Sequence, residues 1–306
     1  MKIAESALEL IGNTPIIHLN ERMVPEGAAD VYVKLESMNL GGSVKDRPAR
    51  NMIEAAEKAG LIEPGKTVLA DCTSGNTGIG EALVAAVKGY KLVIVMSEKA
   101  SVERRRLMQA YGAELVFSPA DGGIEGDFEV FDRLVEENGY FPLRQFENMD
   151  NPAAHVKTTG PEIVEQMGGV PDIFVAGCGT GGTFSGVSEY LKSVRKDVYC
   201  VAVEPASSPV LSGGKAGHHK IPGIGPGIVP KTTSTGLIDE VIDVDDADAA
   251  ETARSLARKA GLLVGYSSGA AVYAAIKVAE RVGKGKRILA IAPDSGSRYL
   301  SMDLFG

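Results

Sequence analysis

The sequence predicts an α/β protein with mostly parallel sheets, and three observations support this. Short β-branched runs alternate with alanine-rich segments of helical spacing along the 306 residues. Glycine and proline contribute 37 and 15 residues without a glycine period, which indicates many tight turns rather than a fibre. Apolar residues at 44% and charged residues at 24% are typical of a globular chain, and the length suggests about two domains.

Each predicted strand is a short apolar run: Val31–Leu35, Thr67–Ala70, Leu92–Met96, Glu114–Phe117, Ile173–Ala176, Val198–Val203 and Arg287–Ile291. Each predicted helix has apolar residues at helical spacing: Asn51–Ala59, Gly78–Lys88, Ser101–Tyr111, Thr183–Lys192, Ala249–Ala260 and Ala270–Val282. Alternation at these lengths favours βαβ units, with sheets covered on both faces. We expect the chain to cross between its halves at Asn148–Pro152, and a functional loop in the glycine- and proline-rich segment 207–235.

Charge and cysteine usage exclude several classes of protein. Aspartate and glutamate outnumber lysine and arginine by 40 to 32, so we expect no nucleic-acid partner. The three cysteines form no CxxC pair, which disfavours a disulfide framework and a zinc site. We therefore predict that the protein has no metal site and is located in the reducing cytosol. The N-terminus lacks the apolar region of a signal peptide and the apolar runs are strand-sized, so no membrane segment is predicted.

The loop Gly177–Gly182 follows a predicted strand and opens a predicted helix. Its glycines allow backbone N–H groups to converge on an anion at the positive end of the helix, which suits a phosphate. The loop also fits the G-x-G-x-x-G pattern of dinucleotide-binding folds, with Glu204 suitably placed for a ribose hydroxyl. From this loop alone, a monophosphate, a dinucleotide and a structural turn without a ligand all stay open.

Two further segments carry polar groups that suit catalysis. Thr73–Gly78 presents small polar side chains at a predicted helix start and suits a carboxylate, whereas an ordinary helix cap would explain only one of them. Lys45 lies beside glycines and an arginine. A lysine in this setting is most often solvated surface. The alternative is an amine whose pKa is lowered by burial and nearby positive charge, and which attacks a phosphorylated aldehyde.

The chain resembles the pyridoxal-phosphate-dependent cysteine synthase and cystathionine β-synthase family. The motifs that carry the resemblance occur in the family's order: Gly12–Pro15, Ser43–Arg47, Thr73–Gly78, Gly177–Thr183, Ser267–Gly269 and Pro293–Leu300. Ordered motifs are more specific than one glycine loop, so they disfavour the dinucleotide interpretation. The resemblance implies two doubly wound domains of the tryptophan synthase β type (fold type II), with pyridoxal 5'-phosphate in the cleft between them. Residues 45–149 would form a smaller, mobile domain with the substrate loop, and residues 1–44 and 150–306 the larger domain with the phosphate loop.

The resemblance also implies a role for each matched residue. Lys45 would be the catalytic lysine that holds the cofactor aldehyde as a Schiff base, while Asn76 would bind the ring 3′ oxygen and Ser267 the pyridine nitrogen. The cofactor phosphate would be bound by Gly179, Thr180, Gly181, Gly182 and Thr183. The residues that bind the amino-acid substrate would be Thr73, Ser74, Thr77, Gln145 and Gly223.

The activity implied by the resemblance is cysteine synthesis by a cytoplasmic homodimer, in which sulfide replaces the acetate of O-acetyl-L-serine. A hydroxyl facing the pyridine nitrogen cannot keep it protonated as a carboxylate would, which favours β-elimination over transamination. Asn39–Gly42 is closer to cystathionine β-synthase-like members, and Cys72 stands where proline or alanine is commoner, so the nucleophile stays open. The alternatives are cystathionine β-synthase, a cysteine desulfhydrase or lanthionine-forming β-lyase, and a catalytically silent scaffold.

Overall fold

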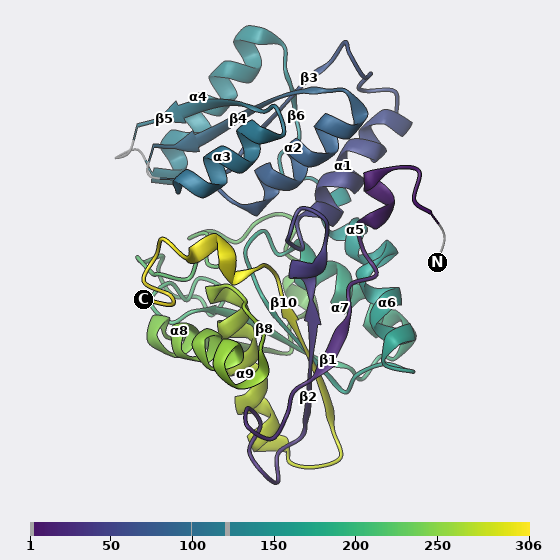
Figure 1. The fold of residues 1–306 in the computed structure, drawn as a ribbon, viewed down its shortest axis with the longest axis vertical. Helices are drawn as coiled ribbons and strands as arrows, with labels where there is room; N and C mark the ends of the chain where they lie inside the picture. The colour runs from purple at the N-terminus through teal and green to yellow at the C-terminus, as the bar shows by residue number, and fades with distance from the viewer. Residues whose placement is uncertain (1–2, 99, 120–122) are drawn as a thin grey trace.

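The computed structural model describes residues 3–98, 100–119 and 123–306, and it confirms the predicted α/β class (Figure 1). A six-stranded sheet has the order β1-β2-β10-β7-β8-β9, and a four-stranded sheet has the order β5-β4-β3-β6. Within the described ranges, every strand pair is parallel except β1 with β2. Figure 1 shows the two sheets in opposite halves of the molecule, each packed against helices.

The four-stranded half is formed by the central part of the chain. Its strands are β3 (Val68–Cys72), β4 (Lys91–Ser97), β5 (Glu114–Ser118) and β6 (Phe141–Pro142). Its helices are α1 (Asp46–Lys58), α2 (Asn76–Lys88), α3 (Val102–Ala110) and α4 (Gly123–Asn138). β4 is buried over its five central residues, as expected for an inner strand of a parallel sheet covered on both faces.

The six-stranded half is formed by both ends of the chain. Its strands are β1 (Ile16–His18), β2 (Asp30–Leu35), β7 (Ile173–Gly177), β8 (Tyr199–Pro205), β9 (Glu240–Val244) and β10 (Arg287–Ala292). Its helices are α5 (Asp150–Lys157), α6 (Thr159–Gln166), α7 (Gly182–Val194), α8 (Asp246–Ser255) and α9 (Tyr266–Val282). Alternate residues of β7 and β8 point to opposite faces: Val175 and Val201 pack with α8 and α9, while Phe174 and Cys200 pack with α7.

Every strand and helix predicted from the sequence overlaps an observed one, but several elements were not predicted. These are β1, β6, β9, α4, α5 and α6. The predicted crossing Asn148–Pro152 is partly helical, because α5 begins at Asp150. Pro152 lies in the first turn of this helix, where proline is tolerated because the backbone N–H groups have no intrahelical partner. The domain boundaries near residues 45 and 149 stay a prediction. No described helix combines the length and apolarity that crossing a membrane requires.

Candidate active site

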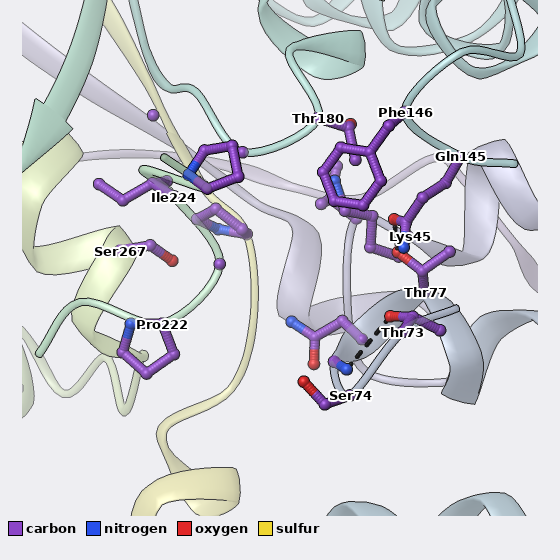
Figure 2. Close-up of a pocket in the computed structure, with 18 of the residues that line it drawn as sticks. Lys45, Thr73, Ser74, Thr77, Gln145, Phe146, Thr180, Pro222, Ile224 and Ser267 are labelled. Carbon is purple, nitrogen blue, oxygen red and sulfur yellow. Dashed lines mark hydrogen bonds between the residues drawn. The ribbon is translucent and has the colours of Figure 1, made fainter. Parts of the chain in front are cut away.

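A cavity of about 320 Å³ opens where strands of both sheets end, and Figure 2 shows residues that line it. The volume is in the range of small-molecule sites, and α/β folds bind ligands at the carboxyl ends of parallel strands. All the site residues predicted from the resemblance except Gly182 line this cavity: Lys45, Thr73, Ser74, Asn76, Thr77, Gln145, Gly179, Thr180, Gly181, Thr183, Gly223 and Ser267. Segments far apart in the sequence therefore meet at one place.

The glycine loop between β7 and α7 has no room for side chains. A Cβ atom at Gly179 would collide with the carbonyl oxygen of Gly223, and one at Gly182 with the side chain of Asn151. Gly181 has a φ of 80°, a left-handed conformation that suits glycine, and a Cβ there would collide with Thr233. Because α7 begins directly after Gly181, its unpaired N–H groups and positive dipole end lie at this loop. The loop is therefore a backbone cradle that suits a phosphate.

Two buried polar residues support this loop, and neither was predicted from the sequence. Asn151 donates a hydrogen bond from Nδ2 to the hydroxyl oxygen of Thr180 at 3.0 Å. Nε2 of His155 lies 3.2 Å from Oγ1 of Thr183. Burial, assisted by nearby positive charge, lowers the pKa of His155 well below its usual range, so the ring is neutral. No sequence spacing connects these residues of α5 with the glycine loop.

Lys45 immediately precedes α1, and its side chain lines the cavity (Figure 2). Burial lowers the pKa of Lys45 to about 8, although the charge of Asp294 acts in the opposite direction. At neutral pH more of this amine is uncharged than for a solvated lysine, which makes it a better nucleophile and base. The structure therefore does not support the interpretation of Lys45 as a solvated surface lysine.

The polar loop between β3 and α2 forms another part of the cavity lining. Its own hydrogen bonds order it, since the Gly75 N–H donates to Oγ1 of Thr73 at 3.2 Å. The Thr77 hydroxyl donates to Oε1 of Gln145 at 2.5 Å, and Nε2 of Gln145 donates to the Cys72 carbonyl at 3.4 Å. Hydroxyls and the N-terminal N–H groups of α2 therefore meet at a site that suits a carboxylate.

The segment 207–235 supplies the wall beside Ser267. Figure 2 shows Pro222, Ile224 and Ser267 on one side of the cavity, with Thr73, Thr77 and Gln145 on the other. A Cβ atom on Gly223 would lie 3.8 Å from Oγ of Ser267, which is in the first turn of α9. The expectation that this glycine-rich segment is part of the site is thus supported by its position.

Asn76, the first residue of α2, contacts both halves of the molecule. Its Nδ2 donates to Oδ2 of Asp294 at 2.7 Å, and the Arg298 guanidinium donates to its Oδ1. The Tyr299 hydroxyl donates to the same oxygen of Asp294 at 2.5 Å. These bonds connect the start of α2 to the segment that follows β10.

Two charged residues of the four-stranded half also line the cavity, although neither was predicted from the sequence. The Arg104 guanidinium of α3 lies 5.4 Å from the centre of the Tyr299 ring, and Asp127 of α4 accepts a hydrogen bond from Ser118. Asp127 is thus hydrogen-bonded within the protein, whereas the Nε of Arg104 is buried without a hydrogen-bond partner among the described residues. Within residues 3–98, 100–119 and 123–306, no cluster of three histidine, cysteine, aspartate or glutamate side chains could hold a metal ion.

Comparison with known proteins gives consistent matches over nearly the whole chain. A family model described as "Pyridoxal-phosphate dependent enzyme" matches residues 7–294. A cysteine synthase of Staphylococcus aureus is 50% identical over 305 residues, which cover 99% of this chain and 98% of that protein. A crystal structure of a cysteine synthase from Entamoeba histolytica superposes with a TM-score of 0.95 at 41% identity, covering 99% of this chain and 91% of that one. An O-ureido-L-serine synthase superposes with a TM-score of 0.96 at 44% identity, covering 99% and 96%.

Proposed function

Since the chain belongs to the family of pyridoxal-phosphate dependent enzymes, we propose that it is a cysteine synthase, which converts O-acetyl-L-serine and sulfide to L-cysteine and acetate. The Staphylococcus aureus relative of that name, 50% identical over nearly the full length of both chains, supports this activity. The observation that carries the proposal is the single cavity shared by Lys45, the glycine loop and the polar loop. An anion cradle, an amine of lowered pKa and a carboxylate site are the groups that this reaction needs.

The residues that line the cavity fit pyridoxal 5'-phosphate. The cofactor phosphate would be bound by the glycine loop, whose backbone is open to an anion because a Cβ has no room there. Lys45 would hold the aldehyde carbon and Ser267 the pyridine nitrogen. Asn76 would bind the ring 3′ oxygen through the second N–H of its amide, since the first donates to Asp294. The residues proposed for the phosphate are Gly179, Thr180, Gly181, Gly182 and Thr183.

Lys45 is the proposed general base of the reaction. When bound, pyridoxal phosphate withdraws electrons from the substrate Cα and so makes its proton removable. The amine of Lys45, whose pKa burial lowers to about 8, accepts this proton. Acetate leaves Cβ with the electrons of the C–O bond, hydrosulfide adds to the same carbon, and Lys45 returns the proton to Cα.

The polar loop is proposed to bind the substrate carboxylate. Thr73 and Ser74 would donate hydroxyl hydrogen bonds together with the first N–H groups of α2, while Thr77 and Gln145 support each other through the 2.5 Å bond. Gly223 would allow the substrate to approach the opposite wall closely. Movement of residues 45–149 towards the rest of the chain would then exclude water, which competes with hydrosulfide for Cβ.

Sulfide is the nucleophile that this cavity should prefer. The segment 207–235 carries exposed Lys215 and Lys220 on a protein of net charge −8, which favours entry of a small anion. Homocysteine and cysteine also need partners for their own carboxylate and ammonium groups, and Asp127, an acidic residue of the cavity lining, is already hydrogen-bonded to Ser118. We expect kcat/KM to be at least about tenfold higher for sulfide, a difference of about 1.4 kcal/mol in the transition state.

Initial rates with O-acetylserine and each of the three nucleophiles, measured on one preparation, test this preference. Faster cystathionine or lanthionine formation would contradict the cysteine synthase proposal and favour one of the related activities. Failure to form any β-replacement product while the cofactor stays bound would instead support the silent scaffold.

A cytoplasmic homodimer is proposed along with this activity. The family resemblance supports the oligomeric state. The cysteines at 72, 178 and 200 are all free and buried, a state that a reducing compartment preserves.

A further inference from the structure

Two buried carboxyl groups of the four-stranded half have no part in the reaction proposed above. Asp71 of β3 is 2% exposed and Glu81 of α2 is 0% exposed. The polar loop with Thr73 and Thr77 lies between them in the sequence. Buried carboxylates usually pair with a cation, but no lysine, arginine or histidine of the described residues forms an ion pair with either.

The hydrogen bonds of this pair are incomplete unless it holds a proton. Oδ1 of Asp71 accepts a hydrogen bond from the Cys72 N–H at 2.8 Å. Its Oδ2 and both carboxyl oxygens of Glu81 are buried and have no well-oriented donor among the described residues. The two side chains nevertheless lie within hydrogen-bonding contact of each other. Because two ionised carboxylates have no proton to donate, one of the two must be protonated.

Glu81 is the group that keeps this proton. Burial raises the pKa of both carboxyls, and the charge of Asp71 raises the pKa of Glu81 further. The ionised form of Asp71 is stabilised by the N–H of Cys72, which donates to its Oδ1, and by the nearby N–H groups of Gln145 and Arg144, whereas Glu81 has no such groups. A neutral Glu81 that donates a hydrogen bond to an ionised Asp71 therefore gives both carboxyl groups a hydrogen-bond partner.

The pair contacts the three segments that carry the proposed carboxylate-binding residues. β3 leads into Thr73, α2 carries Thr77, and the N–H groups of Arg144 and Gln145 face Asp71. Arg144 has a φ of 51°, an uncommon conformation for a residue with a Cβ, so its turn needs support from its surroundings. The hydrogen bond between Thr77 and Gln145 joins two of these segments directly.

The position of α2 also affects Lys45. A Cβ atom on Gly80, the residue before Glu81, would lie 2.9 Å from the Lys45 carbonyl oxygen, so helix and lysine backbone are in close contact. A shift of α2 would therefore be transmitted to Lys45 as well as to Thr77.

We propose that Glu81 is a positioning residue, whose protonated carboxyl donates a hydrogen bond to Asp71 and so holds β3, α2 and the Arg144–Gln145 turn in the arrangement that binds the substrate carboxylate. The role in substrate binding rests on the proposed function, but the shared proton itself does not. Glu81 acts through the polar loop and touches no substrate atom.

The surroundings of the pair supply no positive charge that could replace the proton. The Cys72 thiol points to the opposite face of β3 from Asp71, where it packs with Ala70, Val95 and Phe131. Burial and then the charges of Asp71, Asp127 and Asp132 raise its pKa, so it stays neutral. Helices α1 and α3 also pack against α2, and their charged groups have other surroundings. The following contacts engage most of them: Arg47 with Glu36 and Glu162, Arg50 with Glu54, Glu57 with Lys88, Arg104 with Tyr299, and Arg105 with Phe117. Asp46 accepts a hydrogen bond from the Gly41 N–H, Glu103 contacts Ser301, and Lys58 and Arg106 are exposed. Loss of the proton at high pH therefore leaves two charges facing each other.

The experiment compares holoenzyme of the wild type with Glu81→Gln, Glu81→Leu and the surface control Glu63→Gln. Glutamine keeps a donor at every pH, whereas leucine removes it. Between pH 7 and 9 the KM for O-acetylserine should rise in the wild type by a factor at least about three times larger than in Glu81→Gln. The kcat of the wild type should change less than its KM over the same range. Glu81→Leu should have a raised KM at both pH values, and Glu63→Gln should behave as the wild type.

Two measurements on the same proteins without substrate test the shared proton. The infrared spectrum of the wild type should contain the C=O stretch of a buried carboxylic acid that Glu81→Gln lacks. Burial also raises the pKa of Asp46 to about 7, but Asp46 is present in both proteins and its band cancels in the difference spectrum. Because the folded-state pKa of Glu81 is raised, its protonated carboxyl stabilises the folded protein at low pH, and this contribution is lost as the pH rises above the ordinary glutamate value of 4.5. The Tm of the wild type should therefore fall relative to that of Glu81→Gln as the pH rises.

Equal KM values and pH profiles in wild type, Glu81→Gln and Glu81→Leu would overturn the positioning role. An infrared spectrum unchanged by Glu81→Gln would overturn the shared proton. A wild-type holoenzyme that does not turn over O-acetylserine would instead contradict the proposed function, while the infrared and Tm comparisons would still decide whether the pair exists.

Discussion

Replacing Lys45 by alanine should lower kcat by at least about 10³-fold, because one side chain supplies both the proposed attachment of the cofactor and the general base. The amine lines the cavity, and burial lowers its pKa to about 8, close to the value at which a base is effective near neutral pH. The cofactor should remain only loosely bound to Lys45→Ala, since the glycine loop would still hold its phosphate. Visible absorption before and after gel filtration measures this loss.

Lys34 is the matched comparison for Lys45, because it is buried too and burial lowers its pKa. Its amine is fully engaged: it donates to the Thr14 carbonyl at 2.9 Å and to Gln166 at 3.1 Å, and pairs with Glu162 at 2.9 Å. Borohydride reduction of the holoenzyme, followed by peptide mass spectrometry, should therefore place the cofactor on Lys45. A label on Lys34 or any other lysine would show that the assignment is wrong.

Substitution of Gly181 by valine should weaken cofactor binding by about 3 kcal/mol, roughly a hundredfold, the scale of several lost charge-assisted hydrogen bonds. The Cβ would collide with the side chain of Thr233, so the glycine loop would have to move away from the phosphate. Cofactor affinity can be measured by titrating the protein freed of cofactor and following the absorption of the bound form.

The matched control for this variant is Gly213→Val. Gly213 has a φ of 84°, nearly that of Gly181, but no atom lies within 4 Å of the position that its Cβ would take. Both variants carry the same backbone strain, so the difference in affinity isolates the crowding at the loop. Equal cofactor affinity in two folded variants would mean that the phosphate is bound elsewhere.

The parts of the site that could be predicted from the sequence are those whose chemistry is local. The glycine loop and the polar loop each lie between an apolar strand and an alanine-rich helix, so position and composition made a bound anion one interpretation of each, beside a structural turn or an ordinary helix cap. The role of Lys45 was not predictable in this way, because a lysine beside glycines is usually exposed. It required the family resemblance, and the structure then provided the burial that makes the amine reactive.

The rest depends on contacts between residues distant in the sequence. Asn76 and Asp294 are hydrogen-bonded although they are 218 positions apart, and no pattern within either segment indicates this. Four of the six missed elements are also short: β6 has two residues, β1 has three, and α5 and α6 have eight each. Periodicity over so few residues does not distinguish a strand or helix from a loop. Length does not explain why α4, with 16 residues, and β9, with five, were missed. Glu81 illustrates the same limit, because a glutamate in a helix is normally exposed.

The visible absorption spectrum of the pure holoenzyme, recorded before and after O-acetylserine and again after sulfide, decides whether this protein is a cysteine synthase. The cysteine synthase proposal predicts a cofactor band at rest, a shift of that band when O-acetylserine loses acetate, and return to the resting spectrum when sulfide is added, with one cysteine formed per site. A protein without a cofactor band, or a spectrum that O-acetylserine does not change, would contradict it.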